Sequence, residues 1–393
     1  MIMFTSVLLQ ILVLIMEAET DAEIRQILQN SDQSLAAAEI NEVLEQQNNI
    51  SLNIAVTGET GAGKSTFINA FRGLNDEDDG AALTGCKETT KEVTAYPHPN
   101  YPNVTFWDLP GIGTTNFPAK KYKKKVGLEK FDFFIIISAN RFTENDVKLN
   151  ILRSLPVTLH CRIKQINDKT MVKSELCFDL FSNTGLQDAG FESPQVFLVS
   201  SFELHEYDIS LLQETFETEL PEHKRNALLM TTPITSLEII AKKKEAFKSK
   251  IKYWAAASAA GAAVSVPGLS IAVDVSILIA AVTQYVHGFG LDVPTMKRLA
   301  ARTGVSYDDL LAVIVSPLAA AEVTSALVLR VMSSLAGRTV LMAVEEGSRF
   351  IPIIGIPIAM GLSYIAIYRV LSHILNTLAE DSERVFRKAF GSK

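Results

Sequence analysis

The sequence predicts an α/β domain with a mostly parallel sheet, inserted in an all-α domain that is formed by the two ends of the chain. Four short apolar runs bounded by Gly and Pro lie between residues 52 and 200, as expected of parallel strands buried on both faces. A glycine-rich segment joins the first run to a helical stretch. After Pro233 no strand-like alternation occurs, so the rest of the chain is predicted to be helical.

The expected elements follow in chain order. Residues 19–47 carry apolar side chains at helical spacing and predict one or two amphipathic helices. The predicted strands are 52–56, 104–107, 133–138 and 196–200, whereas 157–163 alternates apolar and polar residues and is typical of an edge strand. The predicted later helices are 236–252, 253–288 with a break at 267–268, 295–302, 306–336, 338–347 and 358–390.

These elements predict four segments: an apolar N-terminal segment (1–18), the first part of the helical domain (19–48), the α/β domain (49–232) and the second part of the helical domain (233–393). The chain has 393 residues, 48% of them hydrophobic and 21% charged, which excludes a disordered protein. Its three cysteines form no Cys-x-x-Cys pair, so a disulfide scaffold, a zinc site and a redox site are not expected. The net charge of −7 argues against a nucleic-acid partner.

Several apolar stretches raise the question of a membrane. Residues 1–16 are uncharged and are consistent with a signal peptide, a short anchor or an artefactual start, but the basic residues and cleavage site of a signal are missing. There is no Gly at position 2 for N-myristoylation. The uncharged stretches 253–273, 275–291 and 350–368 are interpreted as core helices, with insertion into lipid as the alternative.

The glycine-rich segment fits the phosphate-binding pattern G-x-x-x-x-G-K-[ST] between a strand and a helix. Its backbone N–H groups are expected to surround a phosphate, while Lys64 contacts the outer phosphates and Ser65 binds Mg²⁺. The predicted nucleotide-binding residues of this segment are Gly58, Glu59, Thr60, Gly61, Ala62, Gly63, Lys64, Ser65 and Thr66.

A second motif supports a switch-type nucleotide hydrolase. Asp108 directly follows the predicted strand 104–107 and is expected to hold Mg²⁺, and the N–H of Gly111 is expected to sense the γ-phosphate. Between the two motifs lies a hydroxyl-rich segment in which Thr90 or Thr89 is the candidate further Mg²⁺ ligand. Ile112 follows Gly111 and cannot orient a water molecule, so slow hydrolysis by the monomer is expected. The basic run 120–125 is either a solvated face or a contact for anionic lipid or another subunit.

The blocks GETGAGKSTFINAFRG, DLPGIGTTNFP, FDFFIIISANRFTENDVKL and SPQVFLVSSFELHEYD resemble the immunity-related GTPases, an interferon-inducible, dynamin-like group. The resemblance implies a Ras-like G domain on a helical domain and GTP-dependent homo- or hetero-oligomers formed through the G domain. It also implies a cytoplasmic protein that acts on intracellular membranes (endoplasmic reticulum, Golgi or pathogen-containing vacuole). Lys64, Gly111 and Glu88 are the implied catalytic residues, with Glu88 acting across a dimer, and Ser200 and Ser201 match a base-contacting loop.

One motif of the family is missing. A Thr/Ser-Lys-x-Asp sequence that recognises guanine is expected within 150–184, but the nearest sequence is 167–169, Asn-Asp-Lys, in the wrong order. Either the sequence contains an error here or base recognition is altered. The leading hypothesis is therefore a GTP-hydrolysing defence protein, and the alternative is a non-hydrolysing regulator or decoy of related GTPases.

Overall fold

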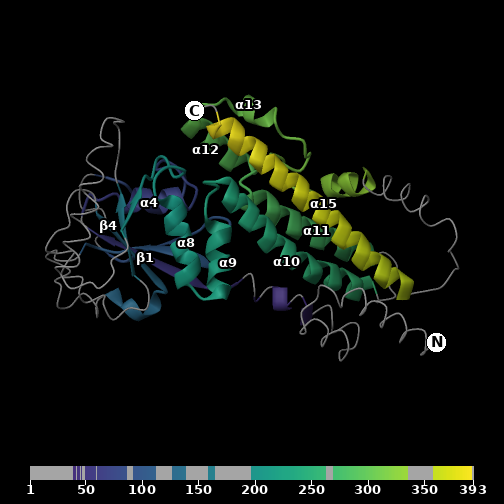
Figure 1. Cartoon of the computed structure of the whole chain (residues 1–393). Helices are drawn as coiled ribbons and strands as arrows, with labels where there is room; N and C mark the ends of the chain where they lie inside the picture. The colour runs from purple at the N-terminus through teal and green to yellow at the C-terminus, as the bar shows by residue number, and fades with distance from the viewer. Residues whose placement is uncertain are drawn as a thin grey trace. The chain divides into compact units, whose positions relative to one another are not determined.

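The computed structural model describes residues 39–40, 42–44, 46, 49–58, 60–85, 92–111, 126–138, 158–163, 196–262, 269–334 and 357–391. The chain forms two compact units, one from Asn49–Ser236 and one from Met1–Asn48 together with Leu237–Lys393 (Figure 1).

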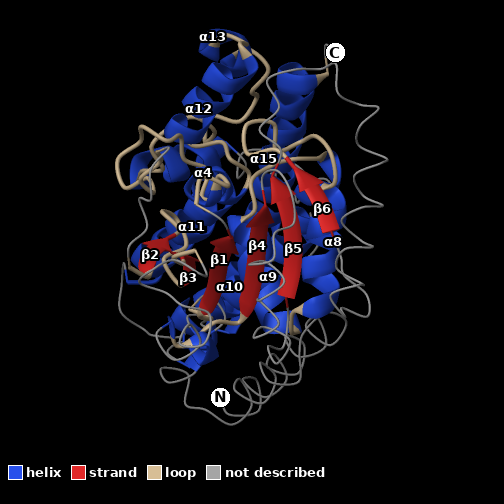
Figure 2. Cartoon of the chain, turned by 90° about the vertical axis from the view of Figure 1, so that its left-hand side faces the viewer, coloured by secondary structure: helices blue, strands red, loops and turns tan. Residues whose placement is uncertain are grey.

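The first unit contains a six-stranded sheet with the strand order β2-β3-β1-β4-β5-β6 (Figure 2). The strands are β1 (Leu52–Gly58), β2 (Thr94–Pro97), β3 (Val104–Asp108), β4 (Phe133–Ser138), β5 (Thr158–Ile163) and β6 (Val196–Val199). All neighbouring strands are parallel except β2 and β3. The carboxyl ends of the five parallel strands therefore lie at one edge of the sheet, where ligands of open α/β sheets bind.

The prediction for residues 157–163 was wrong. We expected an edge strand, but β5 pairs in parallel with both β4 and β6 and is an interior strand. The alternation of apolar and polar side chains indicates which face of a strand is buried. Whether a strand lies at the edge of the sheet depends instead on whether the backbone N–H and C=O groups on both of its sides are paired with a neighbouring strand. The true edge beside β3 is β2, a short strand that the apolar pattern does not reveal because its residues alternate between half-buried and exposed.

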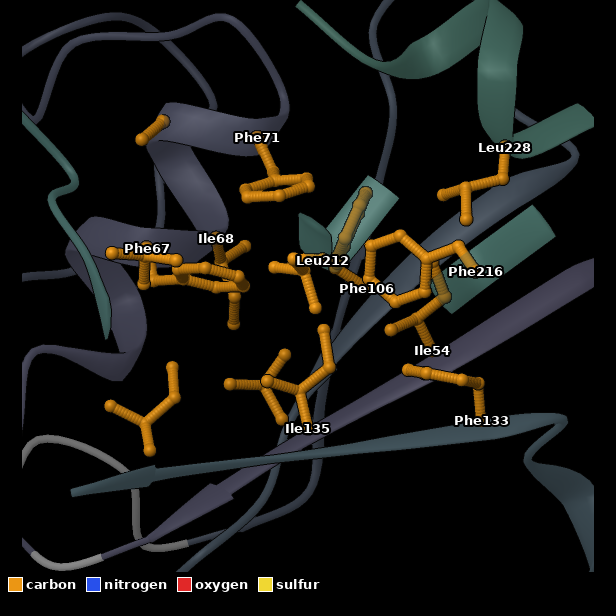
Figure 3. Close-up of a cluster of buried hydrophobic side chains, with 14 of the residues drawn as sticks. Ile54, Phe67, Ile68, Phe71, Phe106, Phe133, Ile135, Leu212, Phe216 and Leu228 are labelled. Carbon is orange, nitrogen blue, oxygen red and sulfur yellow. The ribbon is translucent and has the colours of Figure 1, made fainter. Parts of the chain in front are cut away.

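Two apolar clusters cover the two faces of the sheet, and alternate residues of β4 supply both. Phe133 and Ile135 face a cluster with helices α4 (Lys64–Phe71) and α8 (Ile209–Glu219), which packs beside α9 (Glu222–Thr231) (Figure 3). Phe134 and Ile136 face a second cluster with Leu128 of the short helix η1 (Leu128–Lys130). This two-sided burial explains why the strands are almost uniformly apolar.

The second unit is built on three long helices, α10 (Leu237–Ala262), α11 (Leu269–Gly288) and α15 (Pro357–Phe390), which pack side by side (Figure 1). The Phe247 ring of α10 lies against Tyr285 and Phe289, with centroid distances of 4.9 and 5.6 Å. Beside them, Lys243 is buried and donates a 2.8 Å hydrogen bond to the carbonyl of Gly288. Burial lowers the pKa of Lys243 to about 7.

The prediction of one helix over 306–336 was wrong as well. The structure has α12 (Val293–Thr303), then the short helix α13 (Tyr307–Leu311), and a separate helix Ser325–Ser334. The fully buried carboxylate of Asp381 in α15 accepts hydrogen bonds from the N–H groups of Val315 and Ser316 at 2.7 and 2.9 Å. These donors are satisfied by a tertiary contact instead of by the next helical turn. The predicted helix 338–347 lies outside the described residues.

In the described part of the chain, the segment Val275–Thr303, which comprises most of α11 and the whole of α12, is long and apolar enough by length and composition to cross a membrane, and its most apolar window has a mean hydropathy of 1.2. Half of its most apolar window is buried inside the protein, and core helices of soluble proteins pass the same test. Of the other predicted apolar stretches, 263–268 and 350–356 lie outside the described residues.

Candidate nucleotide-binding site

The phosphate loop joins the end of β1 to the start of α4, as its sequence predicts. Gly58 has φ +142°, and a Cβ atom built there would lie 1.9 Å from the carbonyl oxygen of Ile137 in β4. Gly63 has φ 90° and precedes the first residue of α4, which has no side-chain cap. Both positions require glycine, one because of a neighbouring backbone and the other because of its left-handed conformation. The resulting helix N-terminus presents its N–H groups in the geometry that binds phosphate.

The structure brings together Ser65 and Asp108, two residues that are 43 positions apart in the chain. The Ser65 hydroxyl donates a 3.0 Å hydrogen bond to Oδ2 of Asp108. Asp108 is 1% exposed, and the register of β1 against β3 pairs it with Val56. The pairing of β1 with β3 thus places the Asp108 carboxylate at the start of α4, within hydrogen-bond distance of the Ser65 hydroxyl.

Lys64 lies beside this pair and bends back over the loop. Its side chain is 7% exposed, and Nζ donates a 3.3 Å hydrogen bond to the carbonyl of Gly58. The ammonium group is therefore held across the loop that the phosphates are expected to occupy. Of the other loop residues, Thr60 and Gly61 are exposed, Ala62 is buried, and Gly111 is buried after β3.

A polar network on α4 fixes the segment that follows the helix, and sequence reasoning did not identify it. Asn69 is fully buried; its Nδ2 donates to the Ala82 carbonyl at 2.9 Å, and its Oδ1 accepts from the Ala82 N–H at 2.6 Å. Nδ2 of Asn69 also donates to Asp76 at 2.9 Å, and Arg72 donates to the carbonyls of Gly80 and Pro97. An Asn inside a helix was the available signal, because Asn disfavours helix interiors unless its amide has partners.

The polar network extends to Thr66, the residue next to the candidate magnesium ligand Ser65. Thr66 is half-buried, and its hydroxyl lies 3.5 Å from Oδ2 of Asp76, at the limit for a hydrogen bond.

Burial raises the pKa of Tyr96 in β2, and the negative charge of Asp108 raises it further. Tyr96 therefore stays neutral beside the Asp108 carboxylate at neutral pH.

Ser200 and Ser201 follow β6 and are both 3% exposed. The Ser200 hydroxyl accepts a 3.1 Å hydrogen bond from the N–H of Glu203. Within the described residues, the buried hydroxyl of Ser201 has no hydrogen-bond partner. The two serines thus lie at the same edge of the sheet as the phosphate loop, on a strand three positions away from β1.

A family model described as Interferon-inducible GTPase (IIGP) matches residues 17–155 and 163–389. The chain belongs to this family. It is 38% identical over 391 residues to Interferon-inducible GTPase 5 of Rattus norvegicus, an alignment that covers 96% of this chain and 84% of the relative. Interferon-gamma-inducible GTPase 10 of Mus musculus is 33% identical over 389 residues, with 95% and 90% covered. Interferon-inducible GTPase 1 of Mus musculus is 36% identical over 298 residues, with 72% of each chain covered.

The resemblance found in the sequence is therefore confirmed at the level of the family. The interruption in the interferon-inducible GTPase match, residues 156–162, overlaps β5 and lies inside the segment 150–184 that lacks the expected guanine motif. Of that segment, the structure describes only the β5 backbone. Glu59, Glu88, Thr89, Thr90 and Ile112 also lie outside the described residues, as does the basic run 120–125.

Proposed function

We propose that this chain binds GTP and hydrolyses it in immune defence, as the names of its relatives suggest. The observation that carries the proposal is the hydrogen bond between Ser65 and Asp108 at the start of α4, next to a phosphate loop in which Gly58 leaves no room for a side chain. The backbone N–H groups of the loop bind the phosphates, and Lys64 stabilises the charge that develops on the outer phosphates.

The residues at this site fit a magnesium ion. Mg²⁺ prefers hard oxygen ligands and is commonly held by one or two protein oxygens together with phosphate. Ser65 and the buried carboxylate of Asp108 supply such oxygens 3.0 Å apart, and a cation beside them offsets the cost of burying that charge. When bound, Mg²⁺ neutralises charge on the phosphates. Thr90 is the proposed further protein ligand.

Hydrolysis is proposed to be slow in the monomer and faster in an oligomer. Ile112 follows Gly111 and has no group that orients water, so that group must come from elsewhere. The resemblance to the family assigns this role to Glu88 of a second G domain. The turnover per molecule then rises with protein concentration. A rate that stays constant over about a hundredfold range of concentration excludes this mechanism.

The two units are proposed to correspond to a Ras-like G domain (49–232) inserted in a helical domain (19–48 and 233–393). Residues 1–18 are proposed to be a separate apolar segment.

The protein is proposed to be cytoplasmic and to associate with intracellular membranes such as the endoplasmic reticulum, Golgi or vacuole. Alkaline carbonate distinguishes the modes of association, because it releases a peripheral protein from a membrane pellet and leaves an inserted one.

The test of the proposed function is the substitution Lys64→Met, which keeps the length of the side chain and removes its charge. We expect GTP binding and hydrolysis to be lost, while circular dichroism is unchanged. Lys248→Met, at an exposed lysine of the other unit, is the matched control. Unchanged turnover of the Lys64 variant would refute the assignment of the phosphate site.

A second candidate function is that of a non-hydrolysing regulator or decoy that pairs with related GTPases. It is favoured by the absence of the Thr/Ser-Lys-x-Asp sequence within 150–184. Without that aspartate, the phosphate loop still binds any nucleoside triphosphate. A site whose polar groups all pair with the correct base rejects the wrong base by a factor of about 10⁴–10⁵, whereas here the discrimination between GTP and ATP falls below about 100-fold. Nucleotide binding without turnover at any protein concentration would favour this candidate.

A further inference from the structure

A stripe of polar side chains runs along one face of α4. Ser65, Asn69 and Arg72 follow each other at intervals of four and three residues, so they lie on one face of the helix. All three are buried. The apolar side chains of Phe67 and Phe71 point instead into the apolar cluster beside the sheet (Figure 3). Each buried polar group of the stripe therefore needs a partner from another part of the chain.

Asn69 holds Ala82 by both of its backbone groups. Oδ1 of Asn69 accepts from the Ala82 N–H at 2.6 Å, and Nδ2 donates to the Ala82 carbonyl at 2.9 Å. Nδ2 also donates to Oδ1 of Asp76 at 2.9 Å. A carboxylate at this position could accept but not donate, and a methyl group could do neither. Ala82 is 0% exposed and the next residue, Leu83, is 75% exposed, so Ala82 is the point where the chain leaves the interior.

A second contact holds the chain directly after Ala82. A backbone hydrogen bond joins Leu83 to the hydroxyl of Tyr96 in β2. Arg72 of the polar stripe lies 5.5 Å from the centre of the Tyr96 ring and donates to the carbonyl of Pro97. The residues between Leu83 and β2 therefore begin and end at positions that are tied to α4.

These contacts determine a position more than they add stability. The amide of Asn69 loses its hydration on burial, and its hydrogen bonds offset that cost. Ala82 buries only one methyl group. A fully satisfied buried polar network instead specifies one arrangement of the groups that it joins. When the ends of a segment are fixed in advance, less conformational entropy is lost when a ligand orders the residues between them.

We propose that Asn69 is a positioning residue for GTP hydrolysis. Through Ala82 it sets where the segment whose sequence contains Glu88 and Thr90 begins, relative to Ser65 one helical turn away on the same face of α4. The inference rests on the proposed function, in which these residues act at the γ-phosphate and the metal ion. It adds a residue that touches neither of them. Segments that respond to the γ-phosphate are ordered by contacts with that phosphate and Mg²⁺, so the effect of Asn69 depends on the γ-phosphate.

The experiment compares nucleotides with and without a γ-phosphate. For wild type and Asn69→Ala, dissociation constants of the whole chain with Mg²⁺ are measured for GDP and for a non-hydrolysable GTP analogue, together with kcat and KM for GTP. We expect Asn69→Ala to weaken binding of the GTP analogue and to lower kcat, each by about 10- to 100-fold, the usual effect of removing a group that orients a metal ligand. The affinity for GDP is expected to stay unchanged, because GDP lacks the phosphate to which the segment responds.

Two further variants separate positioning from support of the fold. Gln213→Ala is the matched control, because Gln213 is also a buried amide of this unit and its partner, Thr235, lies outside the segment 82–96. It should lower the melting temperature without changing the ratio of GTP-analogue to GDP affinity. Tyr96→Phe removes only the hydroxyl that bonds to Leu83 and should shift this ratio in the same direction as Asn69→Ala. The test therefore does not depend on whether Asn69→Ala folds.

Two outcomes would overturn the inference. Equal losses of GDP and GTP-analogue affinity in Asn69→Ala and Tyr96→Phe would show that these side chains only support the fold. Unchanged GTP-analogue affinity and kcat in both variants would exclude a positioning role. In either case wild type still binds GTP and the proposed function stands, whereas a wild type that binds neither nucleotide refutes the proposed function itself.

Discussion

The substitution Asp108→Asn separates the cost of burying a carboxylate from the benefit of binding a metal ion with it. The side chain is 1% exposed, and the Ser65 hydroxyl can still donate a hydrogen bond to the amide oxygen of the variant. Without nucleotide, we therefore expect the melting temperature to stay the same or to rise, because a buried charge is removed and the hydrogen bond is kept. With Mg²⁺ and GTP, the variant is expected to gain far less stability than wild type.

The magnitude follows from binding linkage. GTP at 100 times its dissociation constant stabilises wild type by about 2.7 kcal/mol, and a change of 1 kcal/mol moves Tm by about 2–4 °C in a unit of this size, so the expected shift is about 5–10 °C. Hundredfold weaker binding in the variant leaves about 0.4 kcal/mol, or about 1–2 °C.

The assay is thermal denaturation with and without Mg²⁺ and GTP, with Asp79→Asn as an exposed control for the same chemical change. A full GTP-dependent shift in the Asp108 variant would show that this carboxylate does not hold the metal ion. A large loss of stability without nucleotide would contradict the view that its role is to bind a ligand.

Three further predictions concern stability. Gly58→Ala should abolish nucleotide binding and, in denaturant titrations, destabilise the unit by more than about 2 kcal/mol, because the new Cβ would overlap the backbone of β4. Gly80→Ala is the control: Gly80 has φ +75° and nothing within 4 Å of a built Cβ, so this substitution should cost only about 1 kcal/mol. The pKa of Lys243 is about 7 in the folded protein and 10.5 in the unfolded chain, so between these pH values the unfolded state binds more protons. The stability of the folded state should therefore rise with pH in that window, and Lys243→Met should remove this pH dependence in melting experiments. Asp381→Ala removes the acceptor of the Val315 N–H and of the buried Ser316 N–H and should destabilise the protein by about 2–4 kcal/mol in urea. Glu380→Ala, with its side chain 64% exposed, should change stability by less than about 0.5 kcal/mol.

Much of the candidate site could be predicted from local sequence. A strand, a glycine-rich turn and a helix start depend on residues within one short segment, so Gly58, Gly63 and Lys64 could be assigned to the loop before any contact was known. The meeting of Ser65 with Asp108 also followed, because two parallel strands that both end in motif residues present them at one edge.

The contacts that hold the site's surroundings could not be predicted in this way. Asn69 binds both backbone groups of Ala82, and Arg72 binds the carbonyl of Pro97, 25 residues later in the chain. No periodicity relates these positions, since Ala82 lies in the irregular segment after α4 and Pro97 is the last residue of β2. Their only trace in the sequence is a polar residue inside an apolar helix.

The sequence by itself determined the five parallel strands, the phosphate loop and the helical character of the second unit, because backbone preference and apolar periodicity act over a few residues. The tertiary structure alone decided which strands are neighbours and where helices end. β5 is interior because β4 and β6 both use its backbone groups. The chain leaves the helical path after α13 because Asp381, 65 residues later, accepts a hydrogen bond from the buried N–H of Ser316. Buried backbone groups must find partners, and only the folded chain decides which groups supply them.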